Sequence, residues 1–210
     1  MHMARTILIW AVLALAIAVP LAFAATSEYL AWRSPIYIAA GLAGVMALCL
    51  ALVQPLLAGG YLPGLPLLRG RRLHRVIGPV LVAAVAIHVA GLWITSPPDV
   101  IDALLFRSPT PFSAWGVIAM WALFATAFLA LFRRRLRPRV WRVAHTSLVC
   151  VVVIGGVVHA LLIEGTMEIW SKAALSALAV ATTAAAVADP WLRARRRSQH
   201  HDPQPRNGEV

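Results

Sequence analysis

Long apolar stretches alternate with short polar ones along the whole chain of 210 residues. About 20 consecutive apolar residues are enough for a helix to cross the hydrocarbon core of a bilayer. Six stretches reach or approach this length, and the last is the shortest. They cover approximately Ile7–Ala25, Ile36–Leu57, Leu73–Ile94, Phe112–Phe132, Val140–Ile163 and Ala173–Ala188. The pattern predicts an all-α membrane protein that forms a bundle of six transmembrane helices.

The first apolar stretch has two interpretations. Arg5 precedes it and Ala22-Phe23-Ala24 ends it, which is typical of a cleaved signal peptide. Its apolar core is long for a signal peptide, however, and Pro20 interrupts it. We therefore expect a retained helix. The choice does not affect the remaining topology, because the second helix starts on the outer side in both cases.

Composition excludes an ordinary soluble domain, because only 13% of the residues are charged and 60% are hydrophobic. The net charge of +11 would suggest nucleic-acid binding in a soluble protein. Here the arginines are clustered between apolar stretches, where they set membrane topology and contact anionic lipid. We therefore expect membrane lipid as a partner and no nucleic acid.

The positive charges are distributed unequally between the two sides of the predicted bundle. Of the 19 Lys and Arg residues, only Arg33, Arg107 and Lys172 lie on one side. All others lie in the termini or in the loops that share a side with them. Cytoplasmic segments carry the excess of Lys and Arg, so the N and C termini are predicted to be cytoplasmic. We therefore expect a multi-pass protein of the cytoplasmic (inner) membrane.

Residues 191–210 differ in composition from the predicted transmembrane domain at residues 1–190. This last segment is basic and then polar. Such a composition is typical of a disordered end, and its arginines suit a lipid surface. We therefore predict a cytoplasmic tail in which His200 and His201 are solvated.

Four histidines lie within the predicted spans, two in the third and two in the fifth. His74 and His88 are 14 residues apart, and so are His145 and His159. Fourteen residues turn through about 1400°, roughly 40° short of four full turns, so both histidines of a helix lie on one face. At ~1.5 Å per residue, they are about 21 Å apart along the helix axis.

The two histidine-bearing helices run in the same direction, so their histidines align by depth. His74 then faces His145 near the cytoplasmic side, and His88 faces His159 toward the outer side. Each pair can supply both axial ligands of a haem iron. We therefore predict two b-type haems, with His74 and His145 on the inner haem iron and His88 and His159 on the outer one. Occupation of both axial positions favours electron transfer.

Two alternatives for these histidines do not involve haem. Each imidazole can instead be hydrogen-bonded to a neighbouring helix, or the four can serve a haem-free transporter of protons or metal ions. A transporter is expected to have acidic residues within its spans, and here only Asp189 lies near one, at its end. The equal spacing on two parallel helices favours haem.

Arginines surround the histidine pair that is predicted to be cytoplasmic. Arg72 and Arg75 flank His74, and Arg142 precedes His145. Haem propionates are carboxylates, which arginine binds through two parallel hydrogen bonds. Positive-inside topology explains the same charges equally well. The candidate haem-binding residues are therefore Arg72, Arg75 and Arg142. Their charges either bind haem propionates or only set the membrane topology.

Glycines within the third and fifth spans also have two interpretations. They either give a porphyrin room against the helix backbone or allow close helix packing. The four are Gly78, Gly91, Gly155 and Gly156.

The segments predicted to be outside contain two further features. Loop 95–111 includes a short amphipathic piece, VIDALLF, which is either a lid over an outer site or a plain connector. Glu164 and Glu168 either attract a cation such as ferric iron or are simply solvated.

The histidines belong to two longer motifs. One is R-R-x-H-R with a second histidine 14 residues later, and the other is W-R-x-x-H with a second histidine 14 residues later. The matching residues are Arg71, Arg72, His74, Arg75, Gly78 and His88, then Trp141, Arg142, His145 and His159. Over roughly residues 36–188 the chain resembles the ferric reductase-like transmembrane domain superfamily. That group includes NADPH oxidases, yeast-type ferric reductases and the haem-bearing subunit of the bacterial periplasmic methionine sulfoxide reductase.

The resemblance implies two b-type haems stacked across the membrane and outward electron flow. Larger members carry a cytoplasmic domain for FAD and NAD(P)H, whereas this sequence has no nucleotide-binding motif. We therefore expect an oxidoreductase component, with FAD only on a separate partner, if at all. The expected donor is a cytoplasmic flavoprotein reductase or a membrane quinol. The expected acceptor is a ferric chelate or a periplasmic redox protein.

Two electron-transfer functions remain open. The first is electron transfer of the ferric-reductase type, from a cytoplasmic-side donor to an outer-side acceptor. The second is that of a haem-bearing subunit that delivers electrons to a periplasmic reductase, as in the methionine sulfoxide reductase. The four histidines favour the first, and the length of the chain resembles the second. No catalytic side chain is predicted in either case, because the haems carry the redox chemistry.

Overall fold

The computed structural model describes the backbone of residues 2–199 and the side chains of residues 3–189. This part of the chain contains seven α-helices, one short 3-10 helix and no β-strand. The elements are α1 (His2–Ala25), η1 (Glu28–Leu30), α2 (Pro35–Gly59), α3 (Leu67–Thr95), α4 (Pro97–Leu104), α5 (Pro111–Leu131), α6 (Pro138–Leu162) and α7 (Ile169–Gln199).

Six of the described helices are long and apolar enough to cross a membrane, which confirms the all-α bundle with six spans. The spans are Met3–Ala25 in α1, the whole of α2, α3, α5 and α6, and Ile169–Asp189 in α7. The remaining helix, α4, has only eight residues and connects α3 to α5. The chain is therefore a multi-pass membrane protein.

Local signals in the sequence set the ends of the helices. Proline occupies the first turn of α2, α5 and α6, where its missing N–H removes no helical hydrogen bond. The Ser34 hydroxyl caps α2 by accepting a hydrogen bond from the backbone N–H of Tyr37 (3.3 Å). α2 ends before Gly60, whose φ of 71° is a left-handed conformation that glycine adopts without strain. The chain then turns back, and α3 packs antiparallel to α2.

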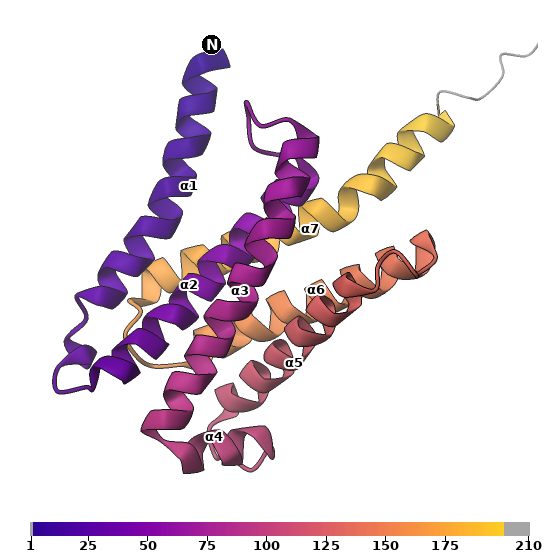
Figure 1. Cartoon of the computed structure of the whole chain (residues 1–210). Helices are drawn as coiled ribbons and strands as arrows, with labels where there is room; N and C mark the ends of the chain where they lie inside the picture. Colours follow the sequence, from indigo (N-terminus) through magenta and orange to yellow (C-terminus); the bar gives the residue numbers. More distant parts are fainter. Residues whose placement is uncertain (1, 200–210) are drawn as a thin grey trace, which may run out of the picture.

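The bundle consists of two antiparallel helix pairs, α2 with α3 and α5 with α6 (Figure 1). α7 packs on α2 and α6 and so joins the two pairs, while α1 packs on α2 and α7. α3 and α6 belong to different pairs, and in the described part of the chain they have no extensive backbone contact. Space therefore exists between the two helices that carry the histidines.

An even number of spans places both ends of the described chain at the same end of the bundle (Figure 1). Loops 60–66 and 132–137 lie at this end, which we name the arginine-rich end after the arginines in these loops and the adjoining helix ends. Loops 26–34, 96–110 and 163–168 lie at the opposite end, named the far end. A cytoplasmic location of the arginine-rich end stays a prediction.

The backbone of α7 is helical through Gln199, so this helix continues past the domain boundary predicted at residue 190. Residues 200–210, the rest of the predicted tail with His200 and His201, lie outside the described residues.

Two apolar clusters hold the bundle together. The larger one joins α1, α2, α6 and α7 and includes Leu52 and Leu175, which are almost fully buried. The smaller one joins α2, α3 and α5 through Ala47, Leu81, Ala84 and Leu123. Leu81 and Ala84 lie between His74 and His88 along α3, so an apolar layer separates the two histidine levels.

Two of the four glycines mark close helix packing. A Cβ on Gly91 would lie 2.6 Å from the Ala40 Cβ, and one on Gly155 would lie 3.1 Å from the Ala119 Cβ and from the Trp115 carbonyl oxygen. Around Gly156, in contrast, no atom lies within 4 Å of a Cβ position. Gly91 and Gly155 therefore admit a neighbouring helix, whereas Gly156 faces open space.

We expect Gly155→Ala and Gly156→Ala to have opposite effects on thermal stability. Alanine favours a helix over glycine by about 1 kcal/mol, and at Gly156 no protein atom opposes this gain when the protein is prepared without haem. At Gly155 the added methyl overpacks the contact between α5 and α6, which costs about 1–3 kcal/mol. The measurement is the unfolding midpoint in detergent, followed by circular dichroism. Equal midpoints for the two variants would contradict this assignment.

Candidate functional site

The four histidines of the spans meet in two pairs, each made by one histidine from α3 and one from α6. The ring centres of His74 and His145 are 6.2 Å apart, and those of His88 and His159 are 6.3 Å apart. The ring planes are nearly perpendicular in both pairs, at 79° and 78°. The structure thus brings together the same residues that were paired by depth from the sequence, in two nearly identical arrangements.

The distance between the rings suits one metal ion between each pair. A shared metal ion lies about 2 Å from each ring nitrogen, and each nitrogen about 1.1 Å from its ring centre, so the ring centres lie roughly 6 Å apart. Direct hydrogen bonding between the rings is not needed to hold them, because three of the four have other partners. The separations of 6.2 and 6.3 Å therefore fit an axial ligand pair of a haem iron.

Backbone carbonyl groups fix three of the imidazoles through Nδ1. His88 pairs with the Ala40 oxygen at 2.8 Å, and His74 with the Gln54 oxygen at 3.2 Å, both on α2. On α5, the Phe112 oxygen pairs with His159 at 2.8 Å. A carbonyl can only accept, so the Nδ1 atoms of His88 and His159 carry the hydrogen and their Nε2 atoms are left unprotonated, whereas the Gln54 side-chain amide also lies against the Nδ1 of His74. This is the tautomer that a metal-binding histidine needs.

Glycines on the neighbouring helices let two of the rings reach these carbonyls. A Cβ on Gly44 of α2 would lie 2.9 Å from the His88 Nδ1, and a Cβ on Gly116 of α5 would lie 2.6 Å from the His159 Nδ1. Each glycine follows the accepting carbonyl by four residues, one helical turn. Both helix pairs therefore use the same arrangement of histidine, carbonyl and glycine.

His145 is held differently from the other three histidines. Its Nδ1 is buried and has no hydrogen-bond partner among the described residues. The ring instead stacks on the Trp141 indole, with ring centres 4.8 Å apart and planes 20° apart. Trp141 precedes His145 by four residues, so both lie on one face of α6. The tryptophan of the W-R-x-x-H motif thus positions the histidine.

A cavity of about 640 Å³ extends from the apolar layer at Leu81 and Leu123, past His88 and His159, to the far end. Its volume lies in the range of cavities that enclose a cofactor. Gly41 and Gly156 line it, and a Cβ at either would meet no atom within 4 Å. Glycine at these positions therefore leaves the space open, which suits a flat porphyrin placed against helix backbone.

The short helix α4 forms part of the cavity wall. Asp99, Val100 and Leu104 line the cavity, and Val100 is buried. The amphipathic piece predicted from loop 95–111 therefore contributes to the cavity wall, and its role as a lid stays a prediction.

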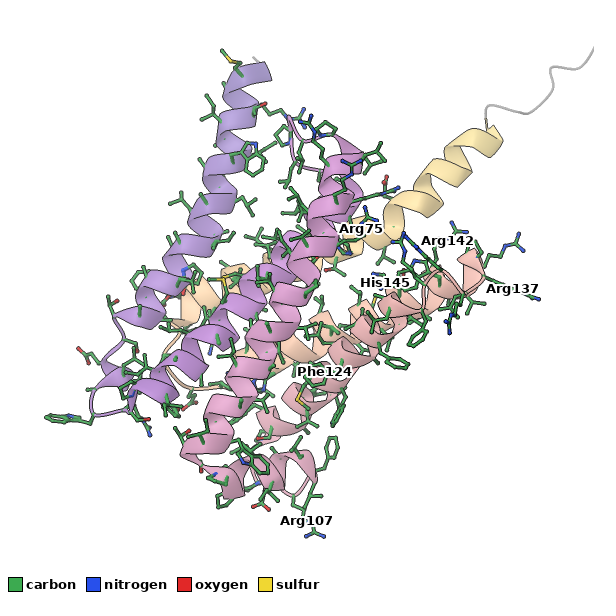
Figure 2. All side chains as sticks on the ribbon, in the orientation of Figure 1. Arg75, Arg107, Phe124, Arg137, Arg142 and His145 are labelled. Carbon is green, nitrogen blue, oxygen red and sulfur yellow. The ribbon has the colours of Figure 1, made fainter. Side chains whose placement is uncertain are left out.

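The three candidate arginines are exposed at the arginine-rich end. Figure 2 shows Arg75 on α3 and Arg142 on α6 at the same end of the bundle as His145. Arg72, Arg75 and Arg142 are not part of the wall of the cavity at His88 and His159. Their predicted contact with haem propionates can thus concern only the His74–His145 pair, and it stays a prediction.

The described residues contain no cluster of three or more His, Cys, Asp or Glu side chains that would hold a bare metal ion. Ligation of haem needs only two protein ligands, because the porphyrin supplies the others. Glu168 caps α7 instead of facing a cation: its carboxylate accepts hydrogen bonds from the backbone N–H groups of Trp170 (2.9 Å) and Ser171 (2.8 Å). These hydrogen bonds hold the pKa of the Glu168 carboxyl below its ordinary value, and the bond from Trp170 makes the largest contribution.

We expect this cap to make the stability of α7 depend on pH. A carboxyl whose pKa is lowered on folding stabilises the folded state above its ordinary pKa, and the contribution is lost as the pH falls through the lowered value. Glu168→Gln should therefore lower the unfolding midpoint at neutral pH and have less effect in acid. Glu164→Gln, which removes a carboxylate outside the cap, is the control. A Glu168→Gln difference that does not change with pH would contradict the cap.

Sequence reasoning identified the histidines but missed the groups that hold them. The stacking of Trp141 on His145 was available from their spacing of four residues on one helix. Gly44 and Gly116 had no such signal, because nothing in their own helices shows which side chain of another helix they face. The accepting carbonyl groups are part of the backbone, which every residue has.

Comparison with protein families gives one match. The family described as ferric reductase like transmembrane component matches residues 40–156. The match covers more than half of the chain and includes His74, His88 and His145, while His159 lies just beyond its end. Comparisons with curated proteins and with solved structures gave no match.

Proposed function

Because the chain belongs to the family of ferric reductase-like transmembrane components, as its histidine motifs indicated, we propose that it transfers electrons across a membrane through two b-type haems. Haem is typical of this family. In this proposal His74 and His145 bind the iron of one haem, and His88 and His159 bind the iron of the other.

The observation that carries the proposal is the equal geometry of the two histidine pairs. Both pairs have ring centres just over 6 Å apart, although they lie at different levels of the bundle. Histidines that only form hydrogen bonds with each other or with a neighbouring helix have no reason to repeat this separation. Two of the rings, those of His88 and His159, also present Nε2 as the free nitrogen, because a carbonyl group occupies Nδ1.

In this proposal the role of the protein residues is to hold the haems in place. When bound, haem supplies an iron that changes its oxidation state by one electron. With one histidine from α3 and one from α6 on each iron, the protein would hold each haem for electron transfer rather than for binding of oxygen. Leu81, Ala84 and Leu123 form the apolar layer between the two levels, which are about 21 Å apart along the helices.

The arginine-rich end is the proposed cytoplasmic entry side for electrons, following the positive-inside rule. The proposed donor there is a cytoplasmic flavoprotein reductase, which would carry any FAD, or a membrane quinol. The proposed acceptor at the far end is a ferric chelate or a periplasmic redox protein. The chain is then an oxidoreductase component of the inner membrane, either of the ferric-reductase type or as the subunit that delivers electrons to a periplasmic reductase.

Electron transfer across liposomes tests this function. The haem-loaded protein is reconstituted into liposomes that enclose ferricyanide, and dithionite is added outside. We expect the enclosed ferricyanide to be reduced, because electrons can cross the bilayer through the two histidine pairs. His74→Ala and His88→Ala should each slow this reduction by roughly tenfold or more, since either change removes one haem.

The matched control is His201→Ala, which changes a histidine outside the spans. Reduction of ferricyanide at the wild-type rate in both His74→Ala and His88→Ala would contradict the proposal. Wild-type protein that contains no haem after expression with a haem precursor would also contradict it and favour haem-free transport.

A further inference from the structure

The far end of the cavity differs chemically from its middle. The middle lies between His88 and His159 and is mostly apolar, whereas the far end contains two cations, Lys172 and Arg33. Three hydroxyl groups lie in the same wall and are hydrogen-bonded to one another at 2.6–3.1 Å. They belong to Ser108, Thr110 and Ser113. The far end thus offers donors and positive charge to an occupant of the cavity.

Lys172 is a buried cation without an anionic partner. Its side chain is only 6% exposed, and its Nζ donates one hydrogen bond, to the Ile163 carbonyl oxygen at 2.7 Å. An ammonium group has three N–H donors, and no carboxylate forms an ion pair with this one in the described part of the chain. A buried charge costs free energy unless it is paired, so an anion is expected beside it.

Three acidic residues near the far end do not fill this role. Glu168 is occupied by the cap of α7, and Asp99 accepts a hydrogen bond from the Ser96 hydroxyl. Glu164 lines the cavity but forms no ion pair with Lys172.

Arg33 is positioned to make a second contact with an anion in the cavity. Its guanidinium lies over the Tyr37 ring, 4.8 Å from the ring centre, and both residues line the cavity. Stacking uses the flat face of the guanidinium and leaves the N–H groups at its edge free to bind a carboxylate. Lys172 and Arg33 come from different loops and helices, so only the fold brings them to one cavity.

We propose that the far end of the cavity binds a carboxylate group of a ligand, with Lys172 as the main contact and Arg33 as the second. Two sources of carboxylate fit this chemistry. One is a propionate of a haem bound between His88 and His159, which rests on the proposed function. The other is a soluble polycarboxylate, such as the citrate of a ferric chelate, which does not rest on it.

The test compares Lys172→Met and Lys172→Arg with the wild type. The matched control is Arg107→Gln, which removes another cation at the far end; Arg107 does not line the cavity, and Figure 2 shows it pointing away from the bundle. Three quantities are measured on the purified protein: haem per chain, the midpoint potentials of the haems, and the heat of binding of citrate by calorimetry.

If the carboxylate is a propionate, Lys172→Met should lower the haem content from about two per chain to about one, or lower one midpoint potential, since a nearby cation favours the reduced form. Lys172→Arg keeps the positive charge and should therefore keep the haem content and the midpoint potentials of the wild type. If the carboxylate is soluble, Lys172→Met should keep both haems and weaken citrate binding roughly tenfold or more. Arg107→Gln should match the wild type in each measurement.

The proposal is overturned if Lys172→Met equals the wild type in haem content, potential and citrate binding. Where Lys172→Met does not fold, Arg33→Gln takes its place, because Arg33 is exposed and is not needed for packing; equality with the wild type overturns the proposal there too. Wild-type protein without haem would contradict the proposed function alone, since the citrate titration still tests the far end.

Discussion

His88→Ala should lower the haem content of the purified protein from about two haems per chain to about one. The two histidine pairs lie about 21 Å apart along the helices, so each pair is a separate site. The ring of His88 pairs with that of His159, with which it is proposed to share one haem iron. Without His88 only one of the two proposed protein ligands of this iron remains, so the haem is held more weakly and we expect it to be lost during purification. The reduced-minus-oxidised spectrum and a haem assay measure the effect.

Double variants, made within one histidine pair or across the two pairs, test the ligand assignment more sharply than single variants do. His74→Ala, His145→Ala and the double variant should all keep the same single haem, because removing the second ligand of a lost haem has no further effect. His74→Ala combined with His88→Ala should leave no haem, because these two belong to different pairs. Retention of both haems in any single variant, or additive loss within one pair, would contradict the assignment of ligands.

Gly116→Val should have nearly the same effect as removing His159. Even a Cβ at Gly116 would lie 2.6 Å from the Nδ1 and 2.7 Å from the Cε1 of the His159 ring. These atoms cannot approach so closely, so the ring must leave the Phe112 carbonyl and lose the orientation that Nε2 requires. We expect the haem content to fall from about two to about one per chain, with the His74–His145 site intact.

Ala125→Val is the control for a larger side chain on α5, because Ala125 is exposed. Gly44→Ala should act in the same way as Gly116→Val but more weakly, since its Cβ would lie 2.9 Å from the His88 Nδ1. If Gly116→Val folds and binds both haems as the wild type does, the glycine does not position the ring.

Much of this arrangement follows from the sequence alone. The six spans follow from the length of the apolar stretches, because the thickness of a bilayer sets a minimum length for a helix. The depth pairing of His74 with His145 and of His88 with His159 follows from equal spacing on two helices that run in the same direction. Helical rise and turn are local properties of the backbone, so the face and the level of a residue can be derived without knowing its neighbours.

The distances across the bundle were decided only by the tertiary structure. Gly155 and Gly156 are adjacent in the sequence, yet one packs against α5 and the other faces the cavity. Lys172 was visible only as one of three cations on its side, and its burial in the cavity wall depends on how α7 meets the other helices. The acceptors for Nδ1 are carbonyl groups, which carry no residue-specific signal. A sequence pattern specifies which face of a helix is turned inward, whereas the atom that lies opposite is set by the packing of helices far apart in the chain.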